Sequence, residues 1–240
     1  MSDPVLSAKP LPAAPSLAPK RAPLQPRAVE TYERILSACS ELLGEVGVER
    51  LSTNLVCQRA GISPPALYQY FPNKYAILHE LSVRLLQQQN RLLLPWAVPA
   101  NLALPEPELA RSIARVFLQL QDVTAQMPAG VWVTRALRAV PALQPVRQRS
   151  REGMTDTVLA PFLIAHPGVD AARARLTIRL AIDSLYVAYE LVFDDPELDP
   201  QAVAMTMAEM VAAQLVRLRA GAAIAGPVAA PVAAGAPAGS

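Results

Sequence analysis

Cysteine and histidine are scarce, because the 240-residue chain has only 2 of each. Cys39 and Cys57 are too few for a disulfide framework or a thiolate metal site. Each occupies a position where a helix takes a small apolar group, so we expect buried core thiols rather than a redox or metal role. His79 and His166 lack partners at metal-ligand spacing, and the sequence has no glycine-rich phosphate loop, nucleophile elbow or HExxH pair. We therefore expect no catalytic residue, metal or cofactor.

Aromatic residues and net charge are also low, at 5% of the chain and a formal +2 from 22 Lys+Arg and 20 Asp+Glu. The hydrophobic fraction of 52% still allows a sizeable core in one or two domains. The most apolar stretch, residues 176–193, contains Arg179, Asp183 and Glu190. Each of these costs about 2.5–3.5 kcal/mol at mid-bilayer, so we expect no transmembrane helix. The first residues do not resemble a secretory signal, and a cytoplasmic location follows as the expectation.

Proline is concentrated at the N-terminus, with seven in residues 1–26. This composition predicts a disordered arm that ends in Lys20 and Arg21, with Arg27 directly after it. These cations have two interpretations, contact with a DNA backbone or minor groove and simple solvation, and we take the solubilising tail as the expectation. Residues 221–240 consist mainly of Ala, Gly, Pro and Val, and we assign this low-complexity tail no fold.

Residues 51–74, LSTNLVCQRAGISPPALYQYFPNK, predict two short helices joined by a glycine-centred turn. Ser52 or Thr53 can cap the first helix, and Gly61 supplies the backbone freedom that the turn needs. Ser63 is the expected N-cap of the second helix, where the two prolines that follow suit the first turn. This arrangement is typical of a helix-turn-helix DNA reader, which commonly binds as a two-fold dimer.

The second helix of this motif has one apolar and one small, neutral face. At about 100° per residue, Leu67 and Phe71 point inward. Pro65, Ala66 and Gln69 point outward, toward the expected DNA. The Gln69 amide offers a donor and an acceptor together, which is the combination that reads the N6 and N7 edge of adenine.

Three further side chains flank that outer face. Tyr68 and Tyr70 are expected along its two rims, where a phenol can reach phosphate, although packing against neighbouring helices is the alternative. An ammonium at Lys74, at the start of the next helix, opposes the helix dipole and is better explained by a phosphate opposite, with plain solvation as the alternative. No acidic residue lies between Glu49 and Glu80, so the local field favours a polyanion.

The flanking sequence predicts further helices and no strands. One helix precedes the motif, at about residues 29–45, and a fourth spans about residues 75–94. The others are expected at about 108–126, 130–140, 143–165, 169–193 and 200–219, with prolines marking the ends of elements.

The last two of these helices are too apolar for one domain face to cover, which suits a four-helix interface between two copies. Arg179 and Asp183, at an i, i+4 interval, are expected to form a structural ion pair at this face. The expected dimer-interface residues are Leu185, Tyr189, Val192, Met207, Val211 and Leu215.

The segments RILSACSELLGEVGVE, QRAGIS and ALYQYFPNK are similar to the N-terminal domain of the TetR family of bacterial transcriptional regulators. Beyond residues 30–80 the resemblance is limited to length and helical pattern. It implies an all-α fold, with a three-helix DNA-binding domain at 27–86 and a helical effector-binding and dimerisation domain at 87–220. Pro64 and Pro65 depart from the polar or glycine contact of many members. The resemblance places the DNA-contacting set at Thr53, Ser63, Tyr68, Gln69, Tyr70 and Lys74.

The resemblance also implies function: a homodimer that binds a palindromic operator, most simply as a repressor, and releases it when a small molecule enters the C-terminal domain. We expect an apolar effector, because these helices carry few charges, and coupling through the helix that starts near Tyr75. The alternatives are a DNA-binding activator or architectural protein without an effector, and an all-helical enzyme. The candidate effector-binding residues, for which plain core packing is the alternative, are Trp96, Phe117, Met127, Trp132, Arg135, Phe162 and Tyr186.

Overall fold

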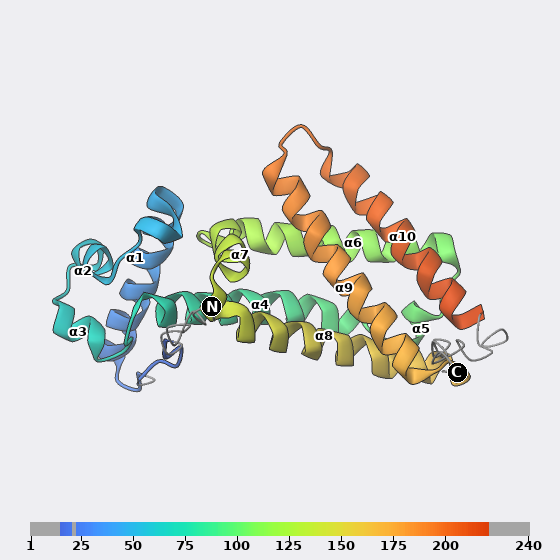
Figure 1. Ribbon diagram of the computed structural model, residues 1–240, viewed down its shortest axis with the longest axis horizontal. Coiled ribbons are helices and arrows are strands. Elements are labelled where there is room, and N and C mark those ends of the chain that lie inside the picture. Colours follow the sequence, from blue (N-terminus) through green and yellow to red (C-terminus); the bar gives the residue numbers. More distant parts are fainter. Residues whose placement is uncertain (1–14, 21–22, 221–240) are drawn as a thin grey trace, which may run out of the picture. The chain divides into compact units, whose positions relative to one another are not determined.

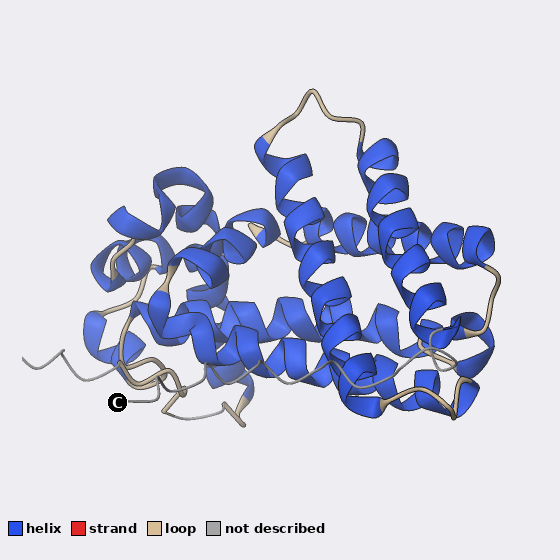
Figure 2. Cartoon of the chain, turned by 45° about the vertical axis from the view of Figure 1, so that its right-hand side comes forward, coloured by secondary structure: helices blue, strands red, loops and turns tan. Residues whose placement is uncertain are grey.

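The computed structural model describes residues 15–20 and 23–220, and within these ranges the secondary structure is entirely helical (Figure 2). The predicted all-α fold is therefore confirmed. The five helices expected beyond residue 100 are found, and only the short α5 and η1 had no counterpart in the prediction. In order, the elements are α1 (Pro26–Arg50), α2 (Thr53–Ala60), α3 (Pro64–Tyr68), α4 (Lys74–Trp96), α5 (Pro99–Leu102), α6 (Glu106–Gln126), α7 (Gly130–Ala139), the 3-10 helix η1 (Pro141–Leu143), α8 (Gln144–Ala165), α9 (Ala171–Asp194) and α10 (Pro200–Ala220).

The described chain forms two compact units. Of the described residues, unit 1 comprises 15–20, 23–92 and 119–151, and unit 2 comprises 93–118 and 152–220. The long helices α4, α6 and α8 contribute residues to both units. Helical periodicity locates helices but does not say which of them pack together, so the expected domain boundary at residue 86 stays a prediction. The expected tail at 221–240 lies outside the described residues.

The core of unit 1 forms around the apolar stripe of α1. Ile35 is fully buried there, and Leu67 of α3, Leu85 of α4 and Phe71 are equally inaccessible. The ring of Tyr32 stacks on Phe71 with centroids 4.8 Å apart. Full burial of such a side chain stabilises the fold by about 1.5–3 kcal/mol, so these contacts fix α3 and α4 against α1.

Both cysteines belong to this core, as expected. Cys39 of α1 and Cys57 of α2 are free thiols with 0% and 4% exposure. Burial raises the pKa of Cys39 to about 12 and also raises that of Cys57. Because the thiolate is the reactive form, both thiols are held in their inert, protonated state.

Unit 2 contains the hairpin of α9 and α10, whose helices lie side by side in both views (Figures 1 and 2). Ala204, Ala208 and Ala212 of α10 are fully buried at i, i+4 intervals, and such small side chains let a neighbouring helix approach closely. At the end of α10, the Arg219 guanidinium donates to the carbonyl of Leu104 at 2.7 Å. None of the helices in the described ranges combines the length and hydrophobicity that crossing a lipid bilayer requires.

Candidate nucleic-acid interface

The helix-turn-helix geometry follows the sequence closely at α2. Ser52 is its N-cap, and the Ser52 hydroxyl accepts a hydrogen bond from the N–H of Leu55 at 3.3 Å. Gly61 ends the helix in the left-handed region, with φ 61° and ψ 40°, where a side chain would be strained. The predicted cap and turn are both confirmed, and they set the angle at which α3 leaves α2.

The start of α3 differs from the prediction in one respect. Ser63 occupies the N-cap position, but its side chain makes no capping hydrogen bond. Pro64 and Pro65 have no N–H, and the N–H of Ala66 already donates to the Ser63 backbone carbonyl at 3.0 Å. No donor of the first turn remains for the hydroxyl, so exposed Ser63 keeps its side chain available to another partner.

The two faces of α3 are those predicted. Leu67 and Phe71 are fully buried, whereas Pro65 and Gln69 are exposed and Ala66 is half-buried. The buried pair anchors the helix on unit 1, and the outer surface is left small and uncharged around the Gln69 amide. Such a surface can approach base edges closely, and its amide can both donate and accept.

The two tyrosines, expected on opposite rims, have different environments. Tyr68 is 40% exposed, and its hydroxyl lies 3.1 Å from the hydroxyl of Thr53, which connects α3 to the start of α2. Tyr70 is only 9% exposed, with its ring edge-on to Tyr32 at 5.9 Å. The Tyr70 ring therefore packs in the core, which is the alternative given above, because the chain turns directly after α3. Its phosphate contact stays a prediction. Thr53 and Tyr68 remain together at the surface.

Lys74 also has partners that the sequence did not predict. Its ammonium donates to the carbonyls of Val48 at 3.0 Å and Leu51 at 2.8 Å. These carbonyls lie at the C-terminal end of α1, where helical acceptors lack intrahelical partners and the helix dipole favours a cation. The sequence analysis took a cation at a helix start as a sign that a phosphate lies opposite. In the structure, the end of α1 supplies a negative partner for this cation.

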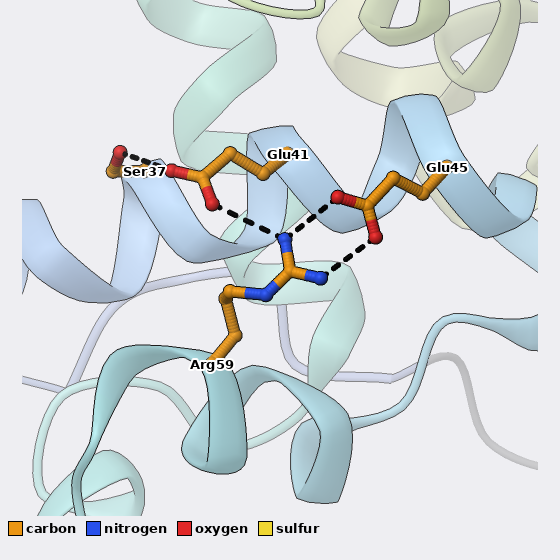
Figure 3. Close-up of polar contacts among 4 residues, drawn as sticks. All are labelled: Ser37, Glu41, Glu45 and Arg59. Carbon is orange, nitrogen blue, oxygen red and sulfur yellow. Dashed lines mark hydrogen bonds and ion pairs between the residues drawn. The ribbon is translucent and has the colours of Figure 1, made fainter.

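A second cation fixes α2 to α1 (Figure 3). The Arg59 guanidinium lies between Glu41 and Glu45, at 3.2 Å from the former and 2.8 and 2.7 Å from the latter. The hydrogen bond from Arg59 lowers the pKa of Glu45, and the two carboxylates raise that of Arg59. Arg59 therefore forms ion pairs with two acidic residues of α1. From α1, Arg34 donates in return to the carbonyls of Ala60 and Gly61 at the turn.

A third cation connects α4 to α1. The two terminal nitrogens of Arg84 bind the Glu33 carboxylate at 2.7 and 2.8 Å, and its Nε binds Glu80 at 3.0 Å. Bidentate geometry of this kind restricts both helices more than a single contact does. The Arg84 hydrogen bond lowers the pKa of Glu33, and burial together with the nearby Glu80 raises the pKa of Tyr32.

Asn73 makes two contacts that the sequence analysis did not predict. Its Oδ1 accepts from the N–H of Ala76 at 3.0 Å and so caps α4, while its Nδ2 donates to the carbonyl of Ser16 at 3.0 Å. The N–H of Lys20 donates to the carbonyl of Tyr70 at 2.8 Å. The described part of the expected disordered arm is therefore hydrogen-bonded to the segment between α3 and α4. An asparagine directly before a predicted helix signalled the cap, but nothing local signalled Ser16.

Unit 2 contains an apolar cavity of about 40 Å³. The nearby polar atoms are already engaged, since Trp96 Nε1 donates to the Ser112 hydroxyl at 2.7 Å and the Tyr186 hydroxyl donates to Met154 Sδ at 3.4 Å. A ligand here would meet hydrocarbon and no open hydrogen-bonding group. The lining residues are Leu93, Trp96, Ile113, Val116, Met154, Val158, Ile178, Ala181, Ile182, Leu185, Val211 and Leu215.

The structure does not bring the expected effector-binding residues together. Of these residues only Trp96 lines the cavity. Tyr186 does not line it but donates a hydrogen bond to Met154, which does. Phe117 and Phe162 are buried core residues of unit 2. The other three belong to unit 1, where Met127 packs on the core and Arg135 lies over the Trp132 ring at 5.0 Å. Residue type alone did not separate cavity lining from ordinary core.

The expected dimer residues are likewise mostly internal. Leu185, Val211 and Leu215 line the cavity, while Tyr189 and Met207 are 5% and 7% exposed. Val192 is half-buried. The sequence did not reveal the faces of these helices because apolar residues surround them almost completely. The Arg179–Asp183 ion pair is present at 3.3 Å.

A different set of apolar side chains remains exposed on the hairpin. We call it the outer stripe: Leu176, Leu180, Val187 and Leu191 of α9, and Met210 of α10. Spacings of 4, 7 and 4 residues place the α9 members on one helix face. Four of the five, all except Leu176, border a groove of about 570 Å³ between the two helices.

Comparisons with known proteins agree with this geometry. Residues 35–81 match the model of "Bacterial regulatory proteins, tetR family". The tetracycline repressor protein class D of Escherichia coli is 38% identical over 65 residues, which is 27% of this chain and 30% of that protein. The match thus spans between a quarter and about two fifths of the length of the curated relatives.

Solved structures resemble a larger part of the chain. SmeT, the repressor of the Stenotrophomonas maltophilia multidrug efflux pump SmeDEF, is similar with a TM-score of 0.59 at 19% identity, over 76% of this chain and 88% of that one. The SmeT–triclosan complex gives a TM-score of 0.56 at 19% identity, over 85% and 100% of the two chains. At this identity the likeness establishes the fold alone.

Proposed function

We propose that this chain, whose residues 35–81 match the model of bacterial regulatory proteins of the tetR family, is a transcriptional regulator that binds an operator in double-stranded DNA. Its action would be on the bacterial nucleoid, in the cytoplasm. The observation that carries the proposal is the outer face of α3, where exposed Gln69 stands on a helix anchored by buried Leu67 and Phe71. A short, rigidly held helix with a neutral amide at its surface suits the major groove.

The role of each neighbour follows from its contacts. Gln69 would read a base edge, most simply adenine, and Pro65 and Ala66 would lie against thymine methyl groups. The Thr53–Tyr68 hydroxyl pair, with 3.1 Å between the oxygens, would present one donor to phosphate, and exposed Ser63 another. Lys74 and Tyr70 would stabilise this surface through their contacts with α1. Sequence readout would therefore depend on few side chains, which calls for two half-sites per operator.

Selection of bound sequences from a random DNA pool tests this function. The expected product is a palindrome whose half-sites lie about one helical turn apart. Gln69→Ala should then relax the preference at one base pair per half-site, with a loss of about 1–3 kcal/mol against the preferred base. Gln58→Ala, an exposed glutamine of α2, is a matched control and should leave the preference unchanged. If wild-type protein enriches no sequence, the proposed function is wrong.

We further propose that the chain acts as a homodimer through the outer stripe. A second copy would cover apolar side chains that the monomer leaves 49% to 70% exposed. Leu180→Glu should produce monomers in sedimentation experiments and reduce operator affinity. Ile164→Glu, which also charges an exposed apolar residue of unit 2 but outside the stripe, should not. Equal behaviour of the two variants would argue against the stripe as the interface.

For the effector we propose an uncharged, apolar small molecule that enters the cavity of unit 2 and causes release from DNA. The lining is hydrocarbon apart from the indole and thioether groups, whose polar atoms are engaged. A cavity that accepts benzene measures about 150 Å³, so at about 40 Å³ this one must open, for example by rotation of Met154. Triclosan, which is bound in the SmeT complex, is a suitable first probe.

The small size of the cavity favours a second candidate function, a regulator without an effector. Tryptophan fluorescence separates it from the ligand-responsive regulator. In a Trp132→Phe variant the signal comes from Trp96, which lines the cavity. Saturable quenching by triclosan, together with lower operator affinity, would support the effector. Absence of quenching by triclosan and other apolar probes would favour the second candidate.

Coupling would pass through α4. This helix starts at Lys74, next to the motif, and its last turn supplies Leu93 and Trp96 to the cavity lining. A ligand that moves this turn would favour a state in which the two recognition helices are wrongly spaced for DNA. Conservative changes at buried Leu81 and Leu85 should weaken the ligand response in folded protein. An unchanged response would argue against this route.

A further inference from the structure

Residues 16–20, which we call the strap, are fixed to unit 1 beside the recognition helix. Asn73 Nδ2 donates to the Ser16 carbonyl at 3.0 Å, and the Lys20 N–H donates to the Tyr70 carbonyl at 2.8 Å. Between these two anchors, Leu17 is half-buried against the core of unit 1. Both anchors lie in residues 70–73, the segment that joins α3 to α4. The strap therefore has a defined position next to the C-terminal end of α3.

This position brings a cation to the expected DNA surface. The backbone of Lys20 is bonded to Tyr70, the residue directly after Gln69, and the Lys20 side chain is exposed. Its ammonium makes no ion pair with any described carboxylate, and a flexible four-carbon stem lets it reach a nearby anion. By contrast, the ammonium of Lys74 is bonded to backbone carbonyls. The strap thus offers a positive charge that is not already bonded within the motif, as those of Arg59 and Lys74 are.

We propose that the strap is part of the DNA interface and that Lys20 binds a phosphate of the DNA backbone next to the bases faced by Gln69. The proposal rests on the DNA-binding function above and replaces the expectation that this region is only a solubilising tail. A contact of this kind positions the recognition helix on the duplex and is independent of base sequence. It also gives Asn73 two tasks, since the same amide caps α4 and holds the strap.

Salt dependence of operator binding by the full chain is the first test. Lys20→Ala keeps the backbone N–H and so keeps the anchor to Tyr70. It should weaken binding to all sequences alike and reduce the slope of log K against log salt by about 2 for a dimer, which is one phosphate contact per subunit. Arg115→Ala, which removes an exposed cation from α6, is the matched control and should leave the slope unchanged.

The second test perturbs the strap from the opposite side. Asn73→Ser keeps an oxygen that can cap α4 but removes the donor to Ser16. It should reduce the slope as Lys20→Ala does, at an unchanged melting temperature. Single methylphosphonate substitutions in the operator then locate the contact. One substitution per half-site should weaken wild-type binding several-fold and have no effect on Lys20→Ala.

The outcomes separate the two proposals. If Lys20→Ala binds with the wild-type slope and the wild-type response to every methylphosphonate, the strap only braces the turn and the phosphate contact is refuted. This conclusion requires that wild-type protein binds the operator and that Gln69→Ala relaxes its sequence preference. If wild-type protein binds no DNA, the proposed function itself fails.

Discussion

Lys74→Met is the substitution that most directly separates a structural from a DNA-binding role for a cation of the motif. The ammonium forms two hydrogen bonds, to Val48 O at 3.0 Å and Leu51 O at 2.8 Å, and the side chain is half-buried. A hydrogen bond made by a charged group contributes about 1.5–3 kcal/mol. Taking the lower value for this partly solvated pair, we expect the free energy of unfolding to fall by about 3 kcal/mol.

Urea denaturation followed by circular dichroism measures this effect. With an m-value of about 1–3 kcal/mol/M, the midpoint should shift down by about 1 M or more at unchanged m. Lys74→Gln provides the comparison, because its amide can still donate to a carbonyl but carries no charge, so its loss should be smaller. At a salt concentration where both proteins are folded, the slope of operator binding should equal that of wild type.

The opposite pattern would refute the reasoning. If Lys74→Met unfolds at the wild-type midpoint, the carbonyl contacts contribute nothing to stability. If its salt slope falls by about 2 as well, each subunit has lost a phosphate contact, and the original expectation from the sequence was right.

Three further predictions concern the cavity, the α1–α4 connection and the buried thiols. Leu215→Ala, at a cavity-lining position with 3% exposure, should cost about 2–5 kcal/mol of stability but let triclosan raise the melting temperature more than in wild type. The Arg84 hydrogen bond lowers the pKa of Glu33 in the folded state, so this pair stabilises the fold above the ordinary pKa of 4.5, and the stabilisation is lost as the pH falls. Glu33→Gln should therefore lower the melting temperature at pH 7, and the melting temperatures of variant and wild type should converge in acid. Because burial raises the pKa of Cys39 to about 12, this thiol should react with a disulfide reagent at pH 8 only after unfolding by urea.

Local chemistry explains which parts of the motif were predictable. The Ser52 cap, the left-handed Gly61 and the inward faces of Leu67 and Phe71 depend on residues within one or two helical turns, and all four were found as expected. Helix existence was predictable for the same reason, since period and proline placement are properties of the segment itself.

The residues whose contacts the sequence did not predict are those whose partners are distant in sequence. Lys74 bonds to the end of α1, more than twenty positions earlier, and Tyr70 packs on Tyr32. Neither partner can be identified from spacing, because both depend on the angle at which α1 crosses the motif. In α9 and α10 the difficulty was different: with apolar residues around nearly the whole helix, periodicity defined no single buried face, so Leu185 and Leu215 were expected outside and lie inside.

The internal use of cations in unit 1 has a consequence for DNA binding. Arg34 binds the carbonyls at the α2 turn, Arg59 and Arg84 bind carboxylates of α1, and Lys74 binds the end of α1. Each of these charges holds the motif together and is thereby withdrawn from phosphate. Since each phosphate neutralised adds about 0.9 to the salt slope, a reader built in this way should bind DNA with a shallow slope. Its affinity must then come from the neutral face of α3 and from the pairing of two subunits. Any remaining electrostatic contribution must come from outside the motif, which is where Lys20 lies.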